Sequence, residues 1–190
     1  MDDDWGDRPI PLGVVVDSDR GSLPFALLHG EALVAHAARA MGQAGVHLLD
    51  LGTPWDHVVE SGAALVWHDA LCPMTPPEFL RACVARGLAD GRAGVGALPV
   101  TDTVKQIVDG PDGPEVGPTV DRDELVMVAA PIVIPSAVLA TLGGWPSTDF
   151  VTALADLRRS GPVTVFEAPA SARRVTSEDD LRALEALTHR

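Results

Sequence analysis

The sequence predicts an α/β protein with a mostly parallel sheet, helices on both faces and a projecting β-arm. Several apolar runs, such as Leu12–Asp17 and Gly94–Val100, are continuous rather than alternating, which is typical of strands that are buried on both faces of a sheet. Helical patterns lie between these runs, as parallel sheets require. A Gly, Pro and Asp turn cluster at 109–114 interrupts the apolar pattern and predicts a hairpin that stands apart from the core.

The first half of the chain alternates strands and helices. We expect strands at 12–17, 46–51, 63–67 and 94–100, because each is a short apolar run bounded by polar or turn residues. A helix is expected over 31–43, where apolar side chains recur on one face. A second helix is expected from Pro76 to about residue 89, because proline is tolerated in the first turn.

The second half continues with the hairpin and returns to the sheet. Its two strands are expected at 104–108 and 115–120, followed by a strand at 126–134 and a helix at 147–159 that opens on good N-cap residues. A strand at 163–167 and a helix at 176–189 complete the chain. Thr176 with Asp179, or Ser177 with Asp180, has the spacing of a capping box at the start of that last helix.

Length and charge limit the function classes. A chain of 190 residues is expected to form one domain, with an acidic tail at 1–8. The formal net charge of −13 repels phosphate backbones and anionic lipid, so we expect neither nucleic acid nor membrane as a partner. The N-terminus lacks the basic and apolar segments of a signal peptide, so we expect a cytoplasmic protein. Cys72 and Cys83 match no metal or redox spacing.

Asp69 is the first residue with a candidate chemical role. It follows the apolar segment that ends at Trp67, and ligands of open parallel sheets bind beyond the carboxyl ends of the strands. A carboxylate there could hold Mg²⁺, which prefers oxygen ligands and phosphate company. An aspartate that caps the turn into the next segment is an equally good interpretation of the position alone.

Five short motifs surround and follow Asp69, and their order and spacing resemble the 2-C-methyl-D-erythritol 4-phosphate cytidylyltransferase family. They are His68-Asp-Ala-Leu-Cys-Pro73, Leu98-Pro-Val-Thr-Asp-Thr-Val-Lys105, Thr119-Val-Asp-Arg122, Ser147-Thr-Asp149 and Arg174-Val-Thr-Ser-Glu-Asp-Asp-Leu181. The resemblance implies a Rossmann-like nucleotidyltransferase fold. It also implies a homodimer that exchanges the arm at about 100–123, and transfer from CTP to methylerythritol phosphate with Mg²⁺ and loss of pyrophosphate.

The resemblance also assigns roles to single residues. Asp69 corresponds to the metal ligand, and Arg20 and Arg174 would offset charge at the α-phosphate of CTP. Thr103, Arg122 and Thr148 would contact the methylerythritol phosphate, with Arg122 reaching across the dimer. An arginine inside an acidic hairpin is a natural phosphate partner because its planar fork binds two oxygens at once.

The N-terminal part departs from the family pattern. The family's glycine-rich loop, A-A-G-x-G-x-R, is replaced by Asp17-Ser-Asp-Arg-Gly-Ser-Leu-Pro24, and the lysine after proline is Phe25. The segment that reads cytosine has no counterpart between Leu51 and Trp67. Ser171 stands for a metal-binding aspartate, and Ala130 for a hydroxyl residue. Fewer amide and lysine donors, each worth about 1.5–3 kcal/mol when it meets a charged group, predict weak CTP binding and low or no activity.

Two alternatives stay open. The chain could be a non-catalytic homologue that binds a sugar phosphate or a partner protein. It could also be another metal-dependent nucleotidyl or glycosyl transferase, because Asp17 and Asp19 have D-x-D spacing, although a polar turn explains that spacing more simply. His68 is interpreted as a packing or turn residue without a chemical role.

Overall fold

The central element is a six-stranded sheet with the strand order β10-β6-β9-β5-β1-β4. The computed structural model describes residues 5–188. Only β9 runs antiparallel to its neighbours β5 and β6, so the sheet is mostly parallel, as predicted. The strands are β1 Leu12–Val16, β4 His47–Leu48, β5 Leu65–Asp69, β6 Gly94–Pro99, β9 Val126–Ile134 and β10 Thr164–Glu167.

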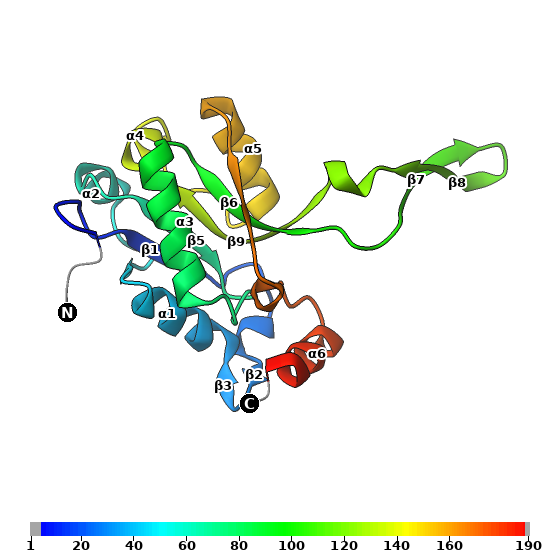
Figure 1. Ribbon diagram of the computed structural model, residues 1–190, viewed down its shortest axis with the longest axis horizontal. Coiled ribbons are helices and arrows are strands. Elements are labelled where there is room, and N and C mark those ends of the chain that lie inside the picture. Colours follow the sequence, from blue (N-terminus) through cyan, green and yellow to red (C-terminus); the bar gives the residue numbers. More distant parts are fainter. Residues whose placement is uncertain (1–4, 189–190) are drawn as a thin grey trace.

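Helices cover both faces of this sheet (Figure 1). On one face α1 and α3 pack on apolar side chains of β5 and β9, and on the other face α2, α4 and α5 bury the opposite side chains of the same strands. Their bounds are α1 Leu33–Gln43, α2 Trp55–Glu60, α3 Pro77–Asp90, α4 Ser136–Leu139 and α5 Phe150–Ser160. The two-sided burial explains the continuous apolar runs of the strands.

The C-terminal segment returns to the N-terminal third of the chain. Helix α6 (Glu178–Thr188) buries Leu184 against Leu28 and Leu33, beside the short hairpin β2 (Leu27–Leu28) and β3 (Glu31–Ala32). Of the Ser177 and Asp180 alternative for its start, one half is present: the Asp180 N–H donates to Ser177 Oγ over 3.1 Å. The Asp180 carboxylate accepts the Thr176 N–H, over 2.9 Å, rather than that of Ser177. Short 3₁₀ turns lie at Leu23–Phe25, Arg122–Glu124 and Ala170–Ala172.

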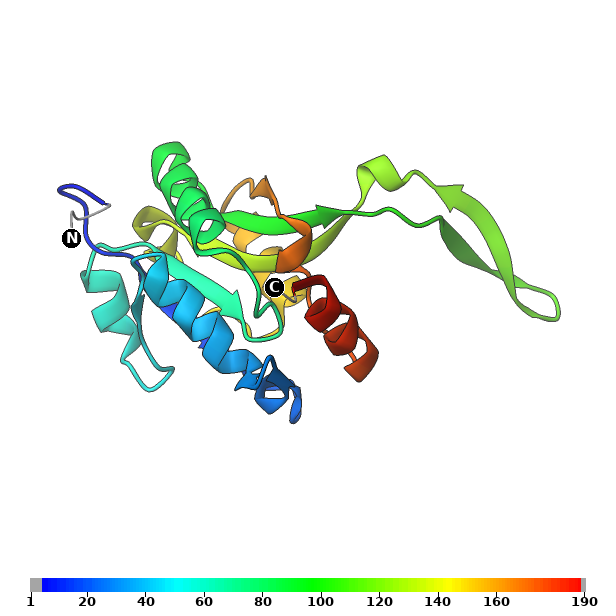
Figure 2. The same cartoon turned by 60° about the horizontal axis from the view of Figure 1, so that its bottom comes forward.

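The predicted hairpin projects away from the sheet as an arm (Figure 2). It consists of β7 (Val104–Gly110) and β8 (Gly113–Val120), which pair only with each other. Ile107 and Val116 on the arm are both 78 % exposed. An isolated two-stranded hairpin is marginally stable in water, and among the described residues this arm has no further strand beside it.

Several boundaries differ from the sequence-based prediction. The strand expected at 46–51 is reduced to two residues at the edge of the sheet, and the short helices α2 and α4 were not predicted. Helix α5 begins at Phe150 rather than at Ser147, because the Asp149 carboxylate accepts the Thr152 N–H over 2.7 Å and caps the helix there. This side-chain cap starts the helix three residues later than the propensity pattern indicates.

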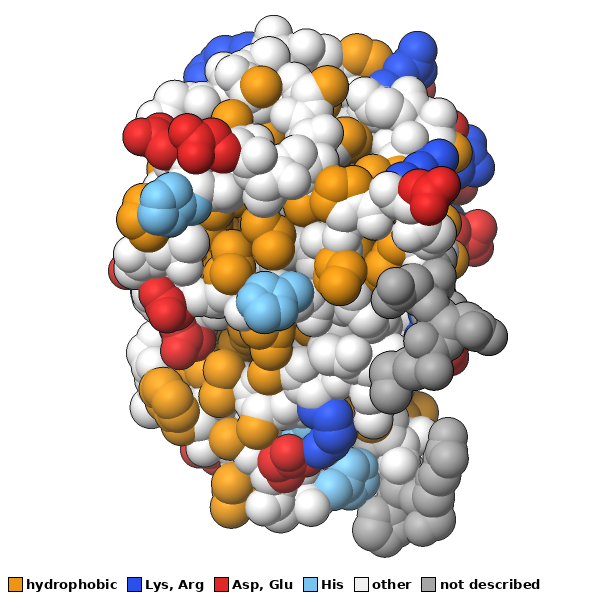
Figure 3. Space-filling model, turned by 90° about the vertical axis from the view of Figure 1, so that its left-hand side faces the viewer, with side chains coloured by type: hydrophobic (Ala, Val, Ile, Leu, Met, Phe, Trp, Pro, Cys, Tyr) orange, Lys and Arg blue, Asp and Glu red, His pale blue; other side chains and the backbone are white. Residues whose placement is uncertain are grey.

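The side of the molecule opposite the arm has a mixed surface. Figure 3 shows hydrophobic side chains distributed over this side between acidic groups and histidines. Leu48 in β4 is among the exposed large hydrophobic residues of the protein, and so are Leu51 and Ile10. Within residues 5–188, no helix has the length and apolar character needed to cross a bilayer.

Candidate functional site

The candidate site lies at the carboxyl ends of β1 and β5. The register pairs Val16 with Asp69, so the loop that follows β1 begins beside the Asp69 carboxylate. Asp69 is the last residue of β5 rather than the first residue after the strand, and its side chain is only 2 % exposed. A buried carboxylate is stable only when it is paired and hydrogen-bonded, so its partners define the site.

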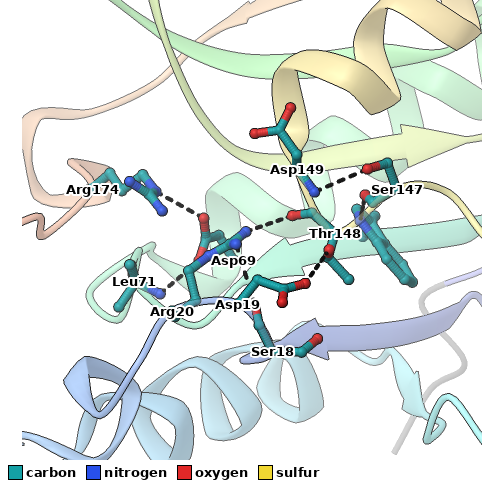
Figure 4. Close-up of polar contacts among 10 residues, drawn as sticks. Ser18, Asp19, Arg20, Asp69, Leu71, Ser147, Thr148, Asp149 and Arg174 are labelled. Carbon is teal, nitrogen blue, oxygen red and sulfur yellow. Dashed lines mark hydrogen bonds and ion pairs between the residues drawn. The ribbon is translucent and has the colours of Figure 1, made fainter.

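One carboxylate binds two arginines from opposite ends of the chain (Figure 4). Arg20 Nε donates to Asp69 Oδ1 over 3.2 Å, and Arg174 Nε donates to Asp69 Oδ2 over 2.9 Å. The Leu71 N–H also donates to Oδ1, over 3.0 Å. The structure therefore brings together the three residues predicted to carry the chemistry, which are separated by up to 154 positions in the sequence.

The two arginines differ in how many of their guanidinium nitrogens donate hydrogen bonds within the protein. The Arg20 side chain is 7 % exposed, and its Nη atoms donate to the carbonyls of Thr148 (2.6 Å) and Ser18 (3.3 Å). The Arg174 side chain is 37 % exposed. Among the described residues, the Nη atoms of Arg174 have no hydrogen-bond acceptor, so its planar fork is available to an anion.

Thr148, predicted as a substrate contact, is part of the same cluster. Its hydroxyl donates to Asp19 Oδ2 over 2.8 Å, while its carbonyl accepts from Arg20. The loop after β1 and the turn before α5 are thus joined by two consecutive residues of the loop. This places Asp19 within the site, a contact that the D-x-D spacing alone does not predict.

A buried tryptophan holds the turn before α5 in place. Trp67 Nε1 donates to the Ser147 carbonyl over 3.1 Å, and the Trp67 ring stacks on Trp145 with a centroid distance of 5.9 Å. Trp145 in turn contacts the edge of Trp55 at 5.4 Å. Sequence reasoning missed this support, although Trp67 precedes Asp69 by two positions on one strand and therefore shares its face of the sheet.

Asp149 is the last residue of the turn before α5, and its carboxyl group is ionised. The Thr152 N–H that it accepts as the N-cap lowers the pKa of the Asp149 carboxyl below its usual value. This fits the general preference of a helix N-terminus for negative charge. The Asp149 charge therefore persists in the site at neutral pH.

These groups enclose a pocket of about 240 Å³. Its lining combines charged side chains with apolar ones. The lining residues are Arg20, Asp69, Val128, Ala129, Asp149, Phe150, Val151 and Arg174. The volume is below the range of roughly 300–1,000 Å³ that is usual for drug-sized ligands, so the pocket has room for a small molecule or for a part of a larger one.

Thr103 and Arg122 lie elsewhere. Both line a second hollow, of about 430 Å³, at the base of the arm, where Arg122 Nη1 donates to the Thr101 carbonyl over 2.8 Å. Neither residue lines the pocket beside Asp69 in the same chain. The predicted site residues therefore form two groups. The first lies at the carboxyl ends of β1 and β5 and comprises Arg20, Asp69, Thr148 and Arg174, and the second, Thr103 and Arg122, lies at the base of the arm.

His68 faces away from this cluster. It is fully buried, and among the described residues neither ring nitrogen makes a hydrogen bond of good geometry. Burial lowers the pKa of His68 to about 4, although the neighbouring Asp69 carboxylate opposes the shift. A neutral, enclosed imidazole agrees with the interpretation of His68 as a packing residue.

Comparison with known proteins agrees with this geometry. The family model of 2-C-methyl-D-erythritol 4-phosphate cytidylyltransferase matches residues 56–190. The chain belongs to this family. The matched part contains Asp69, Arg174, the arm and the turn before α5, whereas the loop with Asp17 and Asp19 lies outside it.

Curated relatives cover part of the chain and are longer. The chain is 38 % identical over 134 residues to a bifunctional IspD/IspF enzyme of Clavibacter michiganensis, which covers 70 % of this chain and 32 % of that protein. It is 36 % identical over 126 residues to the methylerythritol phosphate cytidylyltransferase of Bordetella petrii, with coverage of 62 % and 52 %. The matches thus span from about a third to about half of these relatives.

Solved structures agree with the fold over nearly the whole chain. The 4-diphosphocytidyl-2C-methyl-D-erythritol synthase of Anaerococcus prevotii matches with a TM-score of 0.66 at 15 % identity, covering 96 % of this chain and 99 % of that one. The cytidylyltransferase of Thermus thermophilus matches with a TM-score of 0.66 at 22 % identity, covering 94 % and 98 %. The predicted Rossmann-like nucleotidyltransferase fold is confirmed.

Proposed function

We propose that the chain transfers a cytidylyl group from CTP to a small phosphate-bearing acceptor, with 2-C-methyl-D-erythritol 4-phosphate as the first candidate, and that it does so slowly. The observation that carries this proposal is the Asp69 carboxylate, which fixes two arginines at the carboxyl ends of β1 and β5. Family membership supports the reaction type.

The reaction needs little covalent chemistry from the protein. An oxygen of the acceptor phosphate attacks the α-phosphorus of CTP, and the bond from that phosphorus to the pyrophosphate oxygen breaks. Catalysis of this type depends on positioning and on neutralising negative charge. Asp69 orients Arg174 so that its free fork can bind a phosphate, and Arg20 adds a second positive charge beside it.

Low activity follows from the charge of the loop after β1. A carboxylate at about 4 Å from a phosphate charge costs roughly 4 kcal/mol at an effective dielectric constant near 20. The loop contributes Asp17 and Asp19, and Asp19 is held in the site by Thr148. Arg20 is already hydrogen-bonded to three groups, so it offers a nucleotide less than a free arginine would.

Asp69 fits the predicted role of an Mg²⁺ ligand when substrate phosphates supply the other ligands of the ion. Both of its oxygens accept N–H groups, and the described residues contain no group of three or more His, Cys, Asp or Glu side chains that could hold a metal. Mg²⁺ commonly binds through one or two carboxylates together with substrate phosphates. We propose that Asp69 would be the protein ligand of an Mg²⁺ ion that binds with the nucleotide, since Oδ2 accepts one N–H group among the described residues whereas Oδ1 accepts two. The ion would supply positive charge to the phosphates.

A homodimer would unite the two groups of predicted residues. The arm is paired only with itself and exposes Ile107 and Val116, and it carries Thr103 and Arg122 at its base. We propose that the arm of a second copy packs on this chain and brings Arg122 to the acceptor phosphate. The proposal explains why the two groups are separate within one chain.

A non-catalytic binding protein is the second candidate, favoured by the contact between Asp19 and Thr148 in the site. Two measurements on the purified chain separate the candidates: pyrophosphate release from CTP with methylerythritol phosphate and Mg²⁺, and calorimetric titration with each ligand. Slow release that depends on both substrates is expected. Binding of the acceptor without release would instead identify the binding protein.

Arg174→Gln tests the pocket itself. We expect acceptor affinity to fall at least tenfold, because the variant lacks the charged fork. Arg173→Gln is the matched control, since the Arg173 guanidinium lies 3.5 Å from Asp180 rather than beside Asp69. Equal effects of the two substitutions, or no binding by the native chain, would contradict the proposed function.

A further inference from the structure

Asp19 has a backbone conformation that is uncommon for residues other than glycine, asparagine and aspartate. Its φ angle is +60°, in the left-handed region that favours glycine or asparagine. Its carboxylate accepts the Thr148 hydroxyl over 2.8 Å. The contact with Thr148 therefore fixes both the backbone turn and the position of a negative charge.

Asp19 and Arg20 bind the same residue from two sides. The Asp19 carboxylate takes the Thr148 hydroxyl, while Arg20 Nη2 donates to the Thr148 carbonyl. Because Arg20 also donates to Asp69, the charge of Asp19 is anchored one residue from a guanidinium of the proposed phosphate pocket. The negative charge of Asp19 and the positive charge of Arg20 are therefore fixed side by side on the loop.

The position of the loop determines which anions are affected. In Rossmann-like folds the turn after the first strand is the place where a dinucleotide or polyphosphate chain lies. A phosphate monoester can be bound by the free fork of Arg174 alone, whose Nε is held by Asp69. A triphosphate extends further, along the loop that here carries Asp17 and Asp19.

We propose that Asp19 is a specificity-determining residue that selects against polyphosphates and leaves the pocket open to a phosphate monoester. This inference rests on the phosphate pocket of the proposed function and identifies the residue that limits CTP binding. Asp19 acts through its charge, and the hydrogen bond from Thr148 keeps that charge in place.

Asp19→Asn isolates the charge. Asparagine tolerates the left-handed backbone and can accept the Thr148 hydroxyl, so the turn is retained while the negative charge is lost. Asp19→Gly is a second variant, which fits φ +60° and also removes the hydrogen bond. Asp50→Asn is the matched control: it removes one charge at the β4 side of the molecule, where Asp50 Oδ1 accepts the Gly52 N–H over 2.7 Å.

The experiment measures dissociation constants by calorimetry for CTP with Mg²⁺ and for methylerythritol phosphate. We expect the ratio of CTP affinity to acceptor affinity to rise at least tenfold in both Asp19 variants and to stay within about twofold in Asp50→Asn. An unchanged ratio in Asp19→Asn would overturn the inference. A rise in Asp19→Gly alone would also overturn it, because the barrier would then be the hydrogen bond and not the charge.

The outcomes separate this inference from the proposed function. Acceptor binding by the native chain with no gain of CTP affinity in Asp19→Asn refutes the role of Asp19 and leaves the pocket intact. Failure of the native chain and of the variants to bind either ligand refutes the pocket, and the role of Asp19 with it.

Discussion

Replacing Asp69 by asparagine tests the central feature of the site, a buried carboxylate shared by two arginines. The substitution keeps the shape of the side chain and removes its charge. An asparagine can accept one of the N–H groups through its oxygen, but its amide nitrogen then faces the other guanidinium as a second donor. We therefore expect the variant to be less stable than the native chain and to bind phosphate poorly.

The magnitude follows from the burial of each partner. Removing one member of a buried ion pair typically costs about 3–5 kcal/mol, and the Arg20 side chain is only 7 % exposed. Arg174 is 37 % exposed, so solvent screens its pair and it adds at most about 0.5 kcal/mol. We expect a loss of roughly 3–5 kcal/mol in the free energy of unfolding, which corresponds to a melting temperature lower by about 6–20 °C for a chain of this size.

Urea unfolding followed by tryptophan fluorescence measures this loss, since Trp67 lies two residues from the substituted position. Asp149→Asn is the matched control, because it makes the same chemical change at an exposed N-cap where asparagine caps equally well. The control is expected to lose less than about 1 kcal/mol. If Asp69→Asn costs no more than this control, the shared carboxylate does not hold the two arginines, and the proposed site is refuted.

Three further predictions concern acid stability, the support of the turn and the arm. Burial lowers the pKa of His68 to about 4. The unfolded chain therefore takes up a proton near pH 6.5 that the native chain takes up only near pH 4. As the pH falls between these values, the free energy of unfolding should decrease by about 3 kcal/mol, at 1.36 kcal/mol per pH unit. Urea midpoints at pH 7, 6 and 5 measure this slope, and its persistence in His68→Leu would assign it to other groups. Trp67→Phe removes the donor to the Ser147 carbonyl. It should weaken acceptor binding several-fold in calorimetry while the helix content measured by circular dichroism stays unchanged. Unchanged affinity would show that the hydrogen bond does not position the turn. Ile107→Ser on the exposed arm should shift sedimentation from dimer to monomer without a large loss of stability, and a native chain that sediments as a monomer would contradict the proposed arm exchange.

The fold was largely predictable because its signals are local. Continuous apolar runs mark strands buried on both faces, and the structure has strands at 12–16, 94–99 and 126–134, close to the predicted positions. The Gly, Pro and Asp cluster of the arm forms a hairpin turn as expected. The short helices α2 and α4 were missed because six and four residues are too few for a periodic pattern to emerge.

The site was predictable only in part. Motif order identified Asp69, Arg174 and Thr148, and the structure places these residues together with Arg20. The roles of Thr103 and Arg122 stay predictions, since one chain holds them apart from the pocket. The contribution of Trp67 has no motif, because an indole that donates to a carbonyl 80 positions away leaves no trace in local spacing.

The sequence by itself determined the elements, the acidic surface and the chemical types that surround Asp69, since these depend on residues close in the chain. Only the tertiary structure decided that Asp19 and Arg20 meet Thr148, and that one carboxylate serves two arginines. The physical reason is that such contacts join positions between 49 and 129 residues apart. Their geometry is set by the packing of the sheet and helices that bring the strand ends together.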